Sequence, residues 1–263
     1  MPTIREIYDV LFAFAPAEMK MDWDTVGLGC GRFETEVTRV LVALDPMLDV
    51  FEEALDRSCE LVVTHHPLLF QPVRQVNDES FEGRNLLYLI SHKIATMNLH
   101  TNLDCCPGGV NDVLAEALGL QDIEVLNPMG MDAKGRPWGL IRTGNVPAQN
   151  LADFAAFVKG ALSCPGLRFA DAGKPVKRVA VGGGSCGSEI DEVLATGCDT
   201  FVTADLKYNH FEEAKYRGLN LIDAGHFATE NPVCALLARL LREAFPNLTV
   251  YLSEKHRDET QFL

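Results

Sequence analysis

The chain has 263 residues, of which 47% are hydrophobic and 23% charged, which is enough apolar material for one large domain or two lobes of ordinary size. Its formal net charge of −14, from 23 basic and 37 acidic residues, disfavours binding to long nucleic acid and to anionic membrane surfaces. The apolar runs are far shorter than the roughly 20 residues that cross a bilayer. Near the N-terminus, where a signal peptide is apolar, the chain carries the charged residues Arg5, Glu6 and Asp9. We therefore expect a soluble cytoplasmic protein.

The first half of the chain alternates strands and helices. Thr3 and Glu6 predict a capping box for a first helix with Ile4, Ile7, Val10 and Leu11 on its buried face. Beyond it, the pattern predicts strands at 39–44, 60–64 and 94–99, and helices at 47–57 and 84–93. This βαβαβ order favours a largely parallel sheet with helices on its faces.

The second half repeats this order after an irregular stretch, 120–176, that contains a strand-like segment at 138–144 and a helical one at 150–159. The predicted strands are 178–184, 199–203 and 219–223, and the predicted helices are 189–196 and 206–217. Sliding the sequence by 139 positions aligns 39–64 with 178–203 without a gap and gives eight identities in 26 positions. Two βαβ units of ordinary composition would explain part of this match, but the similar residues before the aligned strands, SCE and GCD, favour an internal duplication.

Histidines follow the predicted strands in both halves. The segment THHPLLF (64–70) places His65 and His66 at a strand end, where each can offer a nitrogen to a different metal, although an isolated pair would more often be two surface histidines on a loop. The segments HTNLD (100–104) and GHFATE (225–230) each present a histidine and, four residues later, a carboxylate: His100 with Asp104 and His226 with Glu230. Because ligands of parallel α/β sheets bind at the carboxyl ends of strands, these residues are candidates for one site.

The types of side chain in this set favour a divalent metal. Imidazole nitrogens together with carboxylate oxygens suit zinc, manganese, iron or nickel. The eight cysteines contain no CxxC pair, so a zinc ribbon is excluded. Three histidines and two carboxylates would suffice for two ions if one carboxylate bridges them, and open coordination positions would then allow catalysis.

Six segments, in this order along the chain, resemble the GTP cyclohydrolase 1 type 2 homolog family, also called Nif-three-like proteins: WDTVGL (23–28), THHPLLF, HTNLD, GGVND (108–112), TADLKYNH (203–210) and GHFATE. The resemblance covers positions 23 to 230 and implies a dinuclear metal site and a toroidal assembly of six chains. It implies metal ligands at His65, His66, Asp104, His226 and Glu230. The sequence departs from the family pattern at Thr25, where Asn is usual, and at Ala204, where Gly is usual, which puts the fine positioning around Asp205 and Lys207 in doubt.

The resemblance also implies roles for Glu230 and His100. Glu230 is expected to bridge the two ions, and His100 to face the substrate or support the ligands, with a buried histidine bonded to the backbone as the alternative. The fold class that follows is α/β, with two related lobes from an internal duplication and the metal site in the cleft between them. We expect residues 1–126 with 227–263 to form the first lobe and residues 127–226 the second.

Two further segments allow more than one interpretation. The glycine-rich segment GGGSCGSE (182–189) follows a strand and opens a helix, so it is either an anion cradle or a tight βα turn. Asp205, Lys207 and His210 either line the metal site or form a solvated helix start with Asp205 as its N-cap.

The sequence thus predicts a metal-dependent hydrolase of a small nucleotide-like or phosphorylated substrate, with two divalent ions per chain and His100 moving a proton. The alternative is a metal-binding regulatory or scaffold protein without catalysis. The expected assembly is a homohexamer, for which Phe12, Phe14 and Phe70 are candidate contacts unless they belong to the core.

Overall fold

The chain forms two compact units in the structure, a computed structural model that describes residues 1–263. Unit 1 comprises Met1–Cys106 and Val233–Arg257, and unit 2 comprises Pro107–Pro232 and Asp258–Leu263. Residues 227–232 and 258–263 therefore lie in unit 2, and so do residues 107–126, whereas the sequence suggested the first lobe for all three segments. For residues 107–126 the reason is that α5 (Val110–Ala117) packs on strands β5 (Gln121–Leu126), β8 (Ile141–Gln149) and β10 (Val176–Val181) of that unit.

Unit 1 is built on a five-stranded sheet with the order β1-β4-β3-β2-β13. Four strands run parallel, as predicted from the βαβαβ pattern, and β1 pairs antiparallel with β4 at one edge. The strands are β1 (Gly27–Cys30), β2 (Arg39–Ala43), β3 (Leu61–Thr64), β4 (Ala95–Asn98) and β13 (Thr249–Leu252). The parallel register brings the carboxyl ends of β2, β3 and β4 to the same edge, with Ala43 beside Thr64 and Thr64 beside Asn98.

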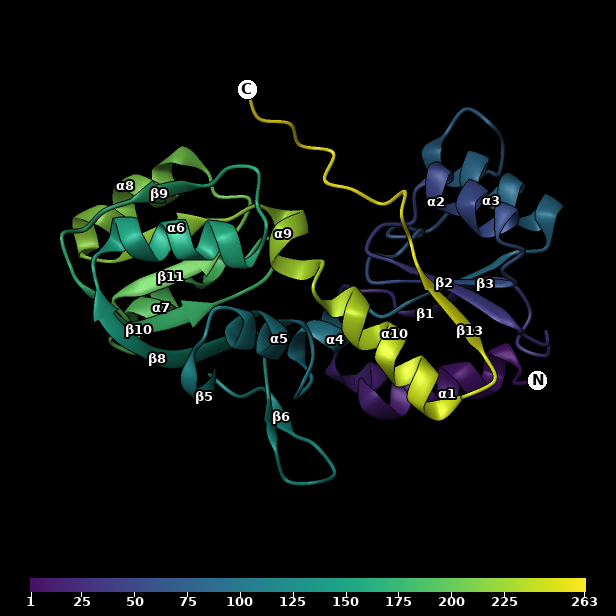
Figure 1. Cartoon of the computed structure of the whole chain (residues 1–263), viewed down its shortest axis with the longest axis horizontal. Helices are drawn as coiled ribbons and strands as arrows, with labels where there is room; N and C mark the ends of the chain where they lie inside the picture. Colours follow the sequence, from purple (N-terminus) through teal and green to yellow (C-terminus); the bar gives the residue numbers. More distant parts are fainter. The chain divides into compact units, whose positions relative to one another are not determined.

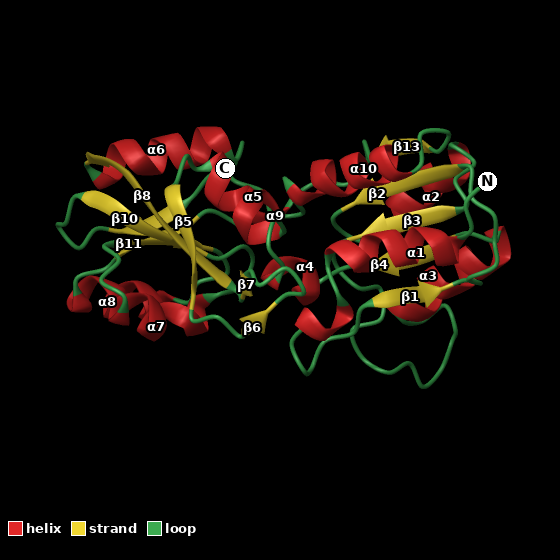
Figure 2. Ribbon diagram, turned by 90° about the horizontal axis from the view of Figure 1, so that it is seen from below, coloured by secondary structure: helices red, strands yellow, loops and turns green.

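Helices cover both faces of the unit 1 sheet (Figures 1 and 2). On one face, α2 (Leu48–Asp56) and α3 (Phe81–His92) pack on Leu41, Ala43 and Val62. On the other face lie α1 (Ile4–Phe14), which has the predicted Thr3–Glu6 capping box, and α10 (Val233–Ala244). Strand residues alternate between the two faces, so the continuous apolar runs of β2 and β3 are buried on both sides.

Unit 2 has a six-stranded mixed sheet with the order β5-β8-β10-β11-β12-β9. Its centre is again three parallel strands, β10, β11 (Thr200–Thr203) and β12 (Asn220–Asp223), while β8 and β9 (Arg168–Ala170) flank this centre in antiparallel orientation. A short hairpin of β6 (Gly130–Met131) and β7 (Pro137–Trp138) extends from the region between β5 and β8.

Two apolar cores lie on opposite faces of the unit 2 sheet. The first core joins α5 and α6 (Leu151–Ala161) to inward residues of β10 and β11, among them Val179 and Val202. The second core joins α7 (Ile190–Ala195) and α8 (Tyr208–Arg217) to Ala180 and Phe201. Figure 2 shows α6 and the pair α7 and α8 on opposite sides of these strands. Both units thus share a parallel three-stranded centre between helices, and the duplication remains a prediction from the sequence.

Several elements were not predicted from the sequence. HTNLD and GHFATE, expected at strand ends, form the short helices α4 (Thr101–Cys105) and α9 (His226–Glu230), which directly follow β4 and β12. Two 3₁₀ turns, Ala17–Met19 and Gly187–Glu189, were also missed. No helix has the length and apolar character that spanning a membrane requires. Phe12 is buried and stacks on Tyr8 at 4.0 Å between ring centroids, so it belongs to the core, not to a surface contact.

Candidate metal centre

In unit 1, the candidate ligands gather at the carboxyl ends of adjacent parallel strands. His65 and His66 follow β3 directly, and His100 and Asp104 come from α4, which follows β4. Because β3 and β4 are paired in parallel register, residues 35 positions apart in sequence end at the same edge. His100 is the N-cap residue of α4 and Asp104 lies one helical turn later, so the four-residue spacing in HTNLD reflects a helix.

His65 is fully buried, and both of its ring nitrogens face oxygen atoms. Its Nδ1 lies 2.8 Å from the carbonyl oxygen of Leu99, which can only accept a hydrogen bond, so Nδ1 carries the proton. Its Nε2 lies 3.5 Å from Oδ1 of Asp104, whose carboxylate is also buried. In the neutral ring the Nε2 lone pair therefore faces the carboxylate of Asp104. A cation bound between these two groups would stabilise the arrangement.

His66 is oriented by an aspartate from the neighbouring strand end. Its Nδ1 lies 2.7 Å from Oδ1 of Asp45, two residues beyond β2, which favours the proton on Nδ1 and the lone pair on Nε2. The backbone of His66 is held as well, because its N–H donates to Leu44 and its carbonyl accepts from the hydroxyl of Thr64. Both the position of the ring and its tautomer are therefore set by the ends of β2 and β3.

His100 pairs with Asp24, a carboxylate whose two oxygens are both engaged. One oxygen lies 2.8 Å from Nδ1 of His100 and accepts from the N–H of Thr25, and the other accepts from the N–H and the hydroxyl of Thr101. Burial opposes ionisation of Asp24, but the hydrogen bonds from His100 and Thr101 outweigh it and lower the pKa of the carboxyl group. Asp24 is thus an anion that holds the ring of His100 in one orientation.

The ligand atoms of His65, His66 and His100 lie within 4.8 Å of one another, close enough to hold a metal ion together. The alternative of a histidine bonded only to the backbone does not hold for His100, since its partner is a side chain. With Asp104 beside His65, unit 1 brings together all four of its predicted site residues.

In unit 2, His226 lies between two carboxylates. Its Nδ1 is 2.7 Å from Oδ2 of Asp205, which follows β11, and its Nε2 is 3.0 Å from Oε2 of Glu230. His226 and Glu230 are the first and last residues of α9, so their i,i+4 spacing places both side chains on one face of that turn. A neutral ring can donate to only one of the two carboxylates, and a cation at the other nitrogen would balance the second.

The glycine-rich segment after β10 makes room for Glu230. Gly184 has a φ of +63°, and a Cβ atom built on it would lie 2.2 Å from Oε1 of Glu230 and 3.1 Å from Nε2 of His226. The N–H groups of Gly183 and Gly184 donate to the side chains of Asn111 and Thr229. These donors are engaged within the unit, so the segment is a tight turn shaped around the carboxylate of Glu230 and not an anion cradle.

Lys207 and His210 belong to the start of a helix, as one interpretation of the sequence had it, but Asp205 is not its N-cap. The N-cap of α8 is Lys207, and its N–H donates to Nδ1 of His210 at 3.3 Å. Asp205 instead has a left-handed backbone with φ of +53° and directs its carboxylate to His226. The expectation that Asp205 caps the helix is therefore wrong, because its side chain is used to orient the histidine.

The hydrogen bonds of the imidazole rings separate the site histidines from His210 and His256, but not from the exposed His92, whose Nδ1 faces the carbonyl oxygen of Tyr88. In His65, His66, His100 and His226 the Nδ1 atom faces a carbonyl or carboxylate oxygen, which directs the Nε2 lone pair away from that partner. In His210 and His256 the Nδ1 atom accepts from a backbone N–H, so Nε2 carries the proton in the neutral ring. Metal-binding histidines are commonly oriented in the first of these two ways.

The donor set fits divalent metal ions. Two atoms bound to one zinc ion at about 2 Å and at tetrahedral angles lie roughly 3.3 Å apart. The distances of 3.5 Å from His65 to Asp104 and 3.0 Å from His226 to Glu230 are close to this value. Each pair joins one imidazole to one carboxylate, a combination that suits zinc, manganese, iron or nickel.

Two of the three aspartates that orient the histidines were not predicted from the sequence. Asp24 lies in the WDTVGL segment and Asp45 follows a predicted strand, but neither was singled out, whereas Asp205 was expected either to line the metal site or to cap a helix. These aspartates could have been identified from the sequence, because Asp45 and Asp205 follow predicted strands and Asp24 lies in a segment that resembles the family. The sequence does not say which aspartate faces which histidine, since the partners are 21 to 76 positions apart.

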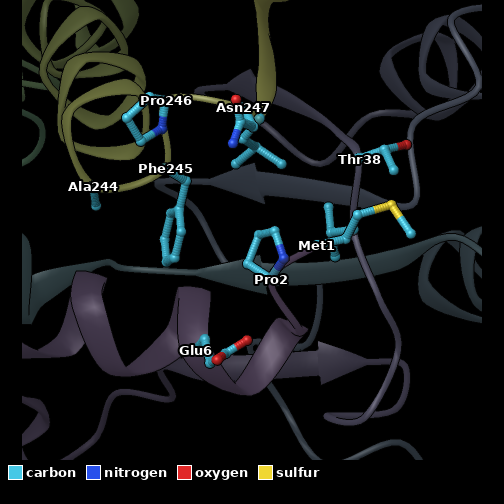
Figure 3. A pocket seen from close by; sticks show the side chains of 10 residues that line it. Met1, Pro2, Glu6, Thr38, Ala244, Phe245, Pro246 and Asn247 are labelled. Atoms are coloured by element: carbon cyan, nitrogen blue, oxygen red, sulfur yellow. The ribbon is translucent and has the colours of Figure 1, made fainter.

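A pocket of unit 1 at the opposite ends of the strands has a different character. It has a volume of about 420 Å³ and lies between the N-terminal residues, Thr38 before β2, and the segment Ala244–Leu248 (Figure 3). Its one acidic residue, Glu6, forms the capping box with Thr3. The candidate ligands are at the carboxyl ends of the strands, where parallel α/β sheets bind their ligands, so this pocket is not part of the candidate metal centre.

Comparison with known proteins agrees with the family resemblance of the sequence. The sequence model of the family described as Duf34/NIF3 (NGG1p interacting factor 3) matches residues 2–259. A Streptomyces coelicolor protein named GTP cyclohydrolase 1 type 2 homolog is 41% identical over 249 residues, which cover 92% of this chain and 87% of that protein.

Solved structures match over the whole chain. The crystal structure of a Bacillus cereus protein related to NIF3 superimposes with a TM-score of 0.93 at 25% identity and covers 100% of this chain and 99% of the other. The crystal structure of Staphylococcus aureus hypothetical protein SA1388 gives a TM-score of 0.92 at 30% identity, with 100% of both chains covered.

Proposed function

On the premise that this chain belongs to the Duf34/NIF3 family, we propose that it binds two divalent metal ions and is a metal-dependent hydrolase of a small nucleotide-like or phosphorylated substrate. The proposed ligands are His65, His66, Asp104, His226 and Glu230, with Glu230 as the carboxylate shared by both ions. Carboxylates suit this role because each oxygen can bind a different cation, whereas an imidazole has only one lone pair to offer.

One observation supports this proposal above the others: the three histidines proposed as ligands, and His100 beside them, have their Nδ1 atoms 2.7 to 2.8 Å from oxygen acceptors. This arrangement fixes the tautomer and keeps Nε2 available as a ligand atom. Ordering such side chains costs conformational entropy, and a ligand set ordered before the metal arrives avoids that cost during binding.

His100 is the residue that we propose for proton transfer. Its ring is held by Asp24, and its side chain is largely but not fully buried, so it remains accessible from solvent. The carboxylate of Asp24 fixes the orientation of the ring and favours the proton on Nδ1, which leaves the Nε2 lone pair free to take up a proton during a reaction. The closeness of His100 to His65 and His66 also allows it to act as a further metal ligand.

The remaining residues of the site hold and shape it. Bound divalent ions would supply activation of water and polarisation of the bond that is cleaved. Asp24, Asp45 and Asp205 orient the imidazoles, and the glycine turn at Gly184 leaves room for the carboxylate of Glu230. The negative charges of Asp104 and Glu230 offset the charge of the ions.

The proposed substrate class follows from the relatives and the charge of the chain. The relatives are named GTP cyclohydrolase 1 type 2 homolog, which suggests a nucleotide-like molecule. A net charge of −14 disfavours long nucleic acids, whereas divalent ions invert the local field for a small anion. We include in the proposal a cytoplasmic location and the homohexameric ring that the family resemblance implies.

The experiment that tests the metal site is elemental analysis of purified protein and two variants, His65→Ala and His226→Ala. We expect each variant to lose at least one ion per chain while its circular dichroism spectrum stays unchanged. His92→Ala is a matched control, because His92 is an exposed histidine whose Nδ1 also bonds a carbonyl, that of Tyr88 in its own helix. Full metal content in both site variants would refute the proposed ligand set.

A further inference from the structure

Two exposed aromatic rings lie beside His100. The side chains of Trp23 and Phe70 are 61% and 48% exposed, and their ring centroids are 5.6 Å apart with an interplanar angle of 49°. Each ring is also close to His100, at 6.1 Å for Trp23 and 6.2 Å for Phe70. Single exposed apolar residues are common, but a pair that converges on a histidine cluster calls for a functional explanation.

Both rings are held outward by buried neighbours. Trp23 precedes Asp24, whose carboxylate is fixed by His100, Thr25 and Thr101. Phe70 follows Leu68, which is buried in the core beneath α2 and α3. Because the chain is anchored next to each ring, the exposure of the rings follows from the fold and not from free chain movement.

The aromatic pair is continuous with the histidines of unit 1. His100 lies 5.3 Å from His65 and 5.5 Å from His66, again between ring centroids. It is therefore a neighbour of the candidate ligands and of the exposed rings. Because the two rings are inclined at 49°, a planar group stacked on one of them would meet the other at an angle, with its edge near His100 and within about one ring width of the proposed metal ligands.

We propose that Trp23 and Phe70 form a stacking surface for the heteroaromatic ring of a small-molecule ligand. This inference rests on the proposed metal site and specifies the part of the substrate that is recognised. Aromatic faces attract planar π systems irrespective of the ring's exact substituents, and stacking of this kind changes affinity by about tenfold or more per ring. A nitrogen or oxygen on the ring edge would be directed towards the histidine cluster, which is why a heteroaromatic ring fits better than a hydrocarbon.

The size of the surface favours a small molecule over a second protein chain. From side-chain areas of about 150–250 Å² for aromatic residues, the two rings expose roughly 250 Å² together. A stable protein interface covers about 800 Å² on each partner. The pair is thus too small for a subunit contact by itself, whereas one or two fused rings would cover it.

The test is calorimetric titration of the full-length, metal-loaded protein with four probes. Guanosine monophosphate, uridine monophosphate and nicotinamide mononucleotide carry three different rings on the same ribose 5-phosphate, and ribose 5-phosphate itself is the fourth probe. We expect at least one ring-bearing probe to bind at least tenfold more tightly than ribose 5-phosphate. Trp23→Ala and Phe70→Ala should each remove most of this difference without changing metal content.

Phe157→Ala is the matched control, since Phe157 is a phenylalanine of unit 2 with a similar exposed fraction, 46%. Four equal affinities, or a ring preference that survives both substitutions, would overturn the stacking surface while leaving the metal site intact. A change of solution mass in Trp23→Ala and Phe70→Ala without any change in probe affinity would instead identify a subunit contact and also overturn it. A protein that takes up no divalent metal would refute the proposed function, and this measurement precedes the titrations.

Discussion

The histidines of the two units are oriented in the same way but in different surroundings. His65 is fully buried and its Nδ1 faces a backbone carbonyl at the end of a strand, whereas the His226 side chain is 36% exposed and its Nδ1 faces Asp205, which is half exposed. A carbonyl fixed between paired strands cannot turn away, but an exposed carboxylate can. The ring of His65 is therefore oriented by the fold itself, while that of His226 depends on two negative charges.

This comparison indicates how each unit would respond to substitution. In unit 1, a substitution that removes one charge affects a histidine cluster that several strand ends hold in place. In unit 2, the buried carboxylate of Glu230 is directly beside Nε2 of His226, and the turn at Gly184 leaves little room for anything else. We therefore expect the largest single effect at Glu230.

Replacing Glu230 by Gln should abolish most binding of both metals and any hydrolytic activity, with little change in fold. Glutamine keeps the shape and removes the charge, so the substitution separates coordination from packing. Elemental analysis of the purified variant measures ions per chain, and Glu243→Gln, a change of an exposed glutamate on α10, is the control. If Glu230→Gln kept two ions per chain, the shared ligand would have to be another residue.

Asp45→Asn and Asp205→Asn sharpen the comparison by changing the orienting anion in each unit. Loss of such a partner typically lowers metal affinity about 10- to 100-fold. We expect the larger loss for Asp45, which is 33% exposed, and about tenfold for Asp205, which is 50% exposed, because solvent weakens the interaction of exposed charges. Competition with a chromogenic chelator measures both affinities, and a larger loss in Asp205→Asn would show that the exposure of the aspartate does not set the order of the two effects.

The smallest effect concerns stability and tests what supports the unit 1 cluster. Glu53 on α2 is buried and accepts hydrogen bonds from the Ser253 hydroxyl and from the N–H groups of Glu254 and Lys255, just beyond β13. This segment leads to His256, whose Nδ1 accepts from the N–H of Leu44, next to Asp45. Glu53→Gln should lower the free energy of unfolding by about 2 kcal/mol at neutral pH, because bonds to a charged group are weakened.

The sign of the pH dependence follows from the carboxyl group of Glu53. Burial raises its pKa, but the hydrogen bonds from Ser253, Glu254 and Lys255 and the charge of Arg57 outweigh burial, so the pKa lies below the ordinary 4.5. The stabilisation is thus fully present above pH 4.5 and is lost as the pH falls through the lowered pKa. Chemical unfolding of the protein and of Glu53→Gln from pH 7 to pH 3 should show two stabilities that converge, and a constant difference would contradict this account.

Much of the fold was predictable because local patterns and packing agree. The apolar runs at 39–44, 60–64 and 94–99 became the parallel strands of unit 1, with bounds within two residues of those expected. The helices between them were also predicted, since their apolar residues recur at helical spacing, although α3 begins three residues before the expected start. In contrast, α4 and α9 were read as strand ends, although the four-residue spacing of His100 and Asp104, and of His226 and Glu230, is itself a helical signal.

The sequence by itself determined the class of fold, the family and the histidines and carboxylates proposed as ligands, because residue type and order along the chain carry that information. Only the tertiary structure decided which oxygen orients each ring: Leu99 for His65, Asp45 for His66, Asp24 for His100 and Asp205 for His226. These partners are 21 to 76 positions apart. Three of the pairs meet because parallel pairing brings strand ends to one edge, and Asp24 reaches His100 because β1, which it precedes, pairs antiparallel with β4. Hydrophobic periodicity says that a strand is buried, but not which strand lies beside it or where a polar side chain at its end will point.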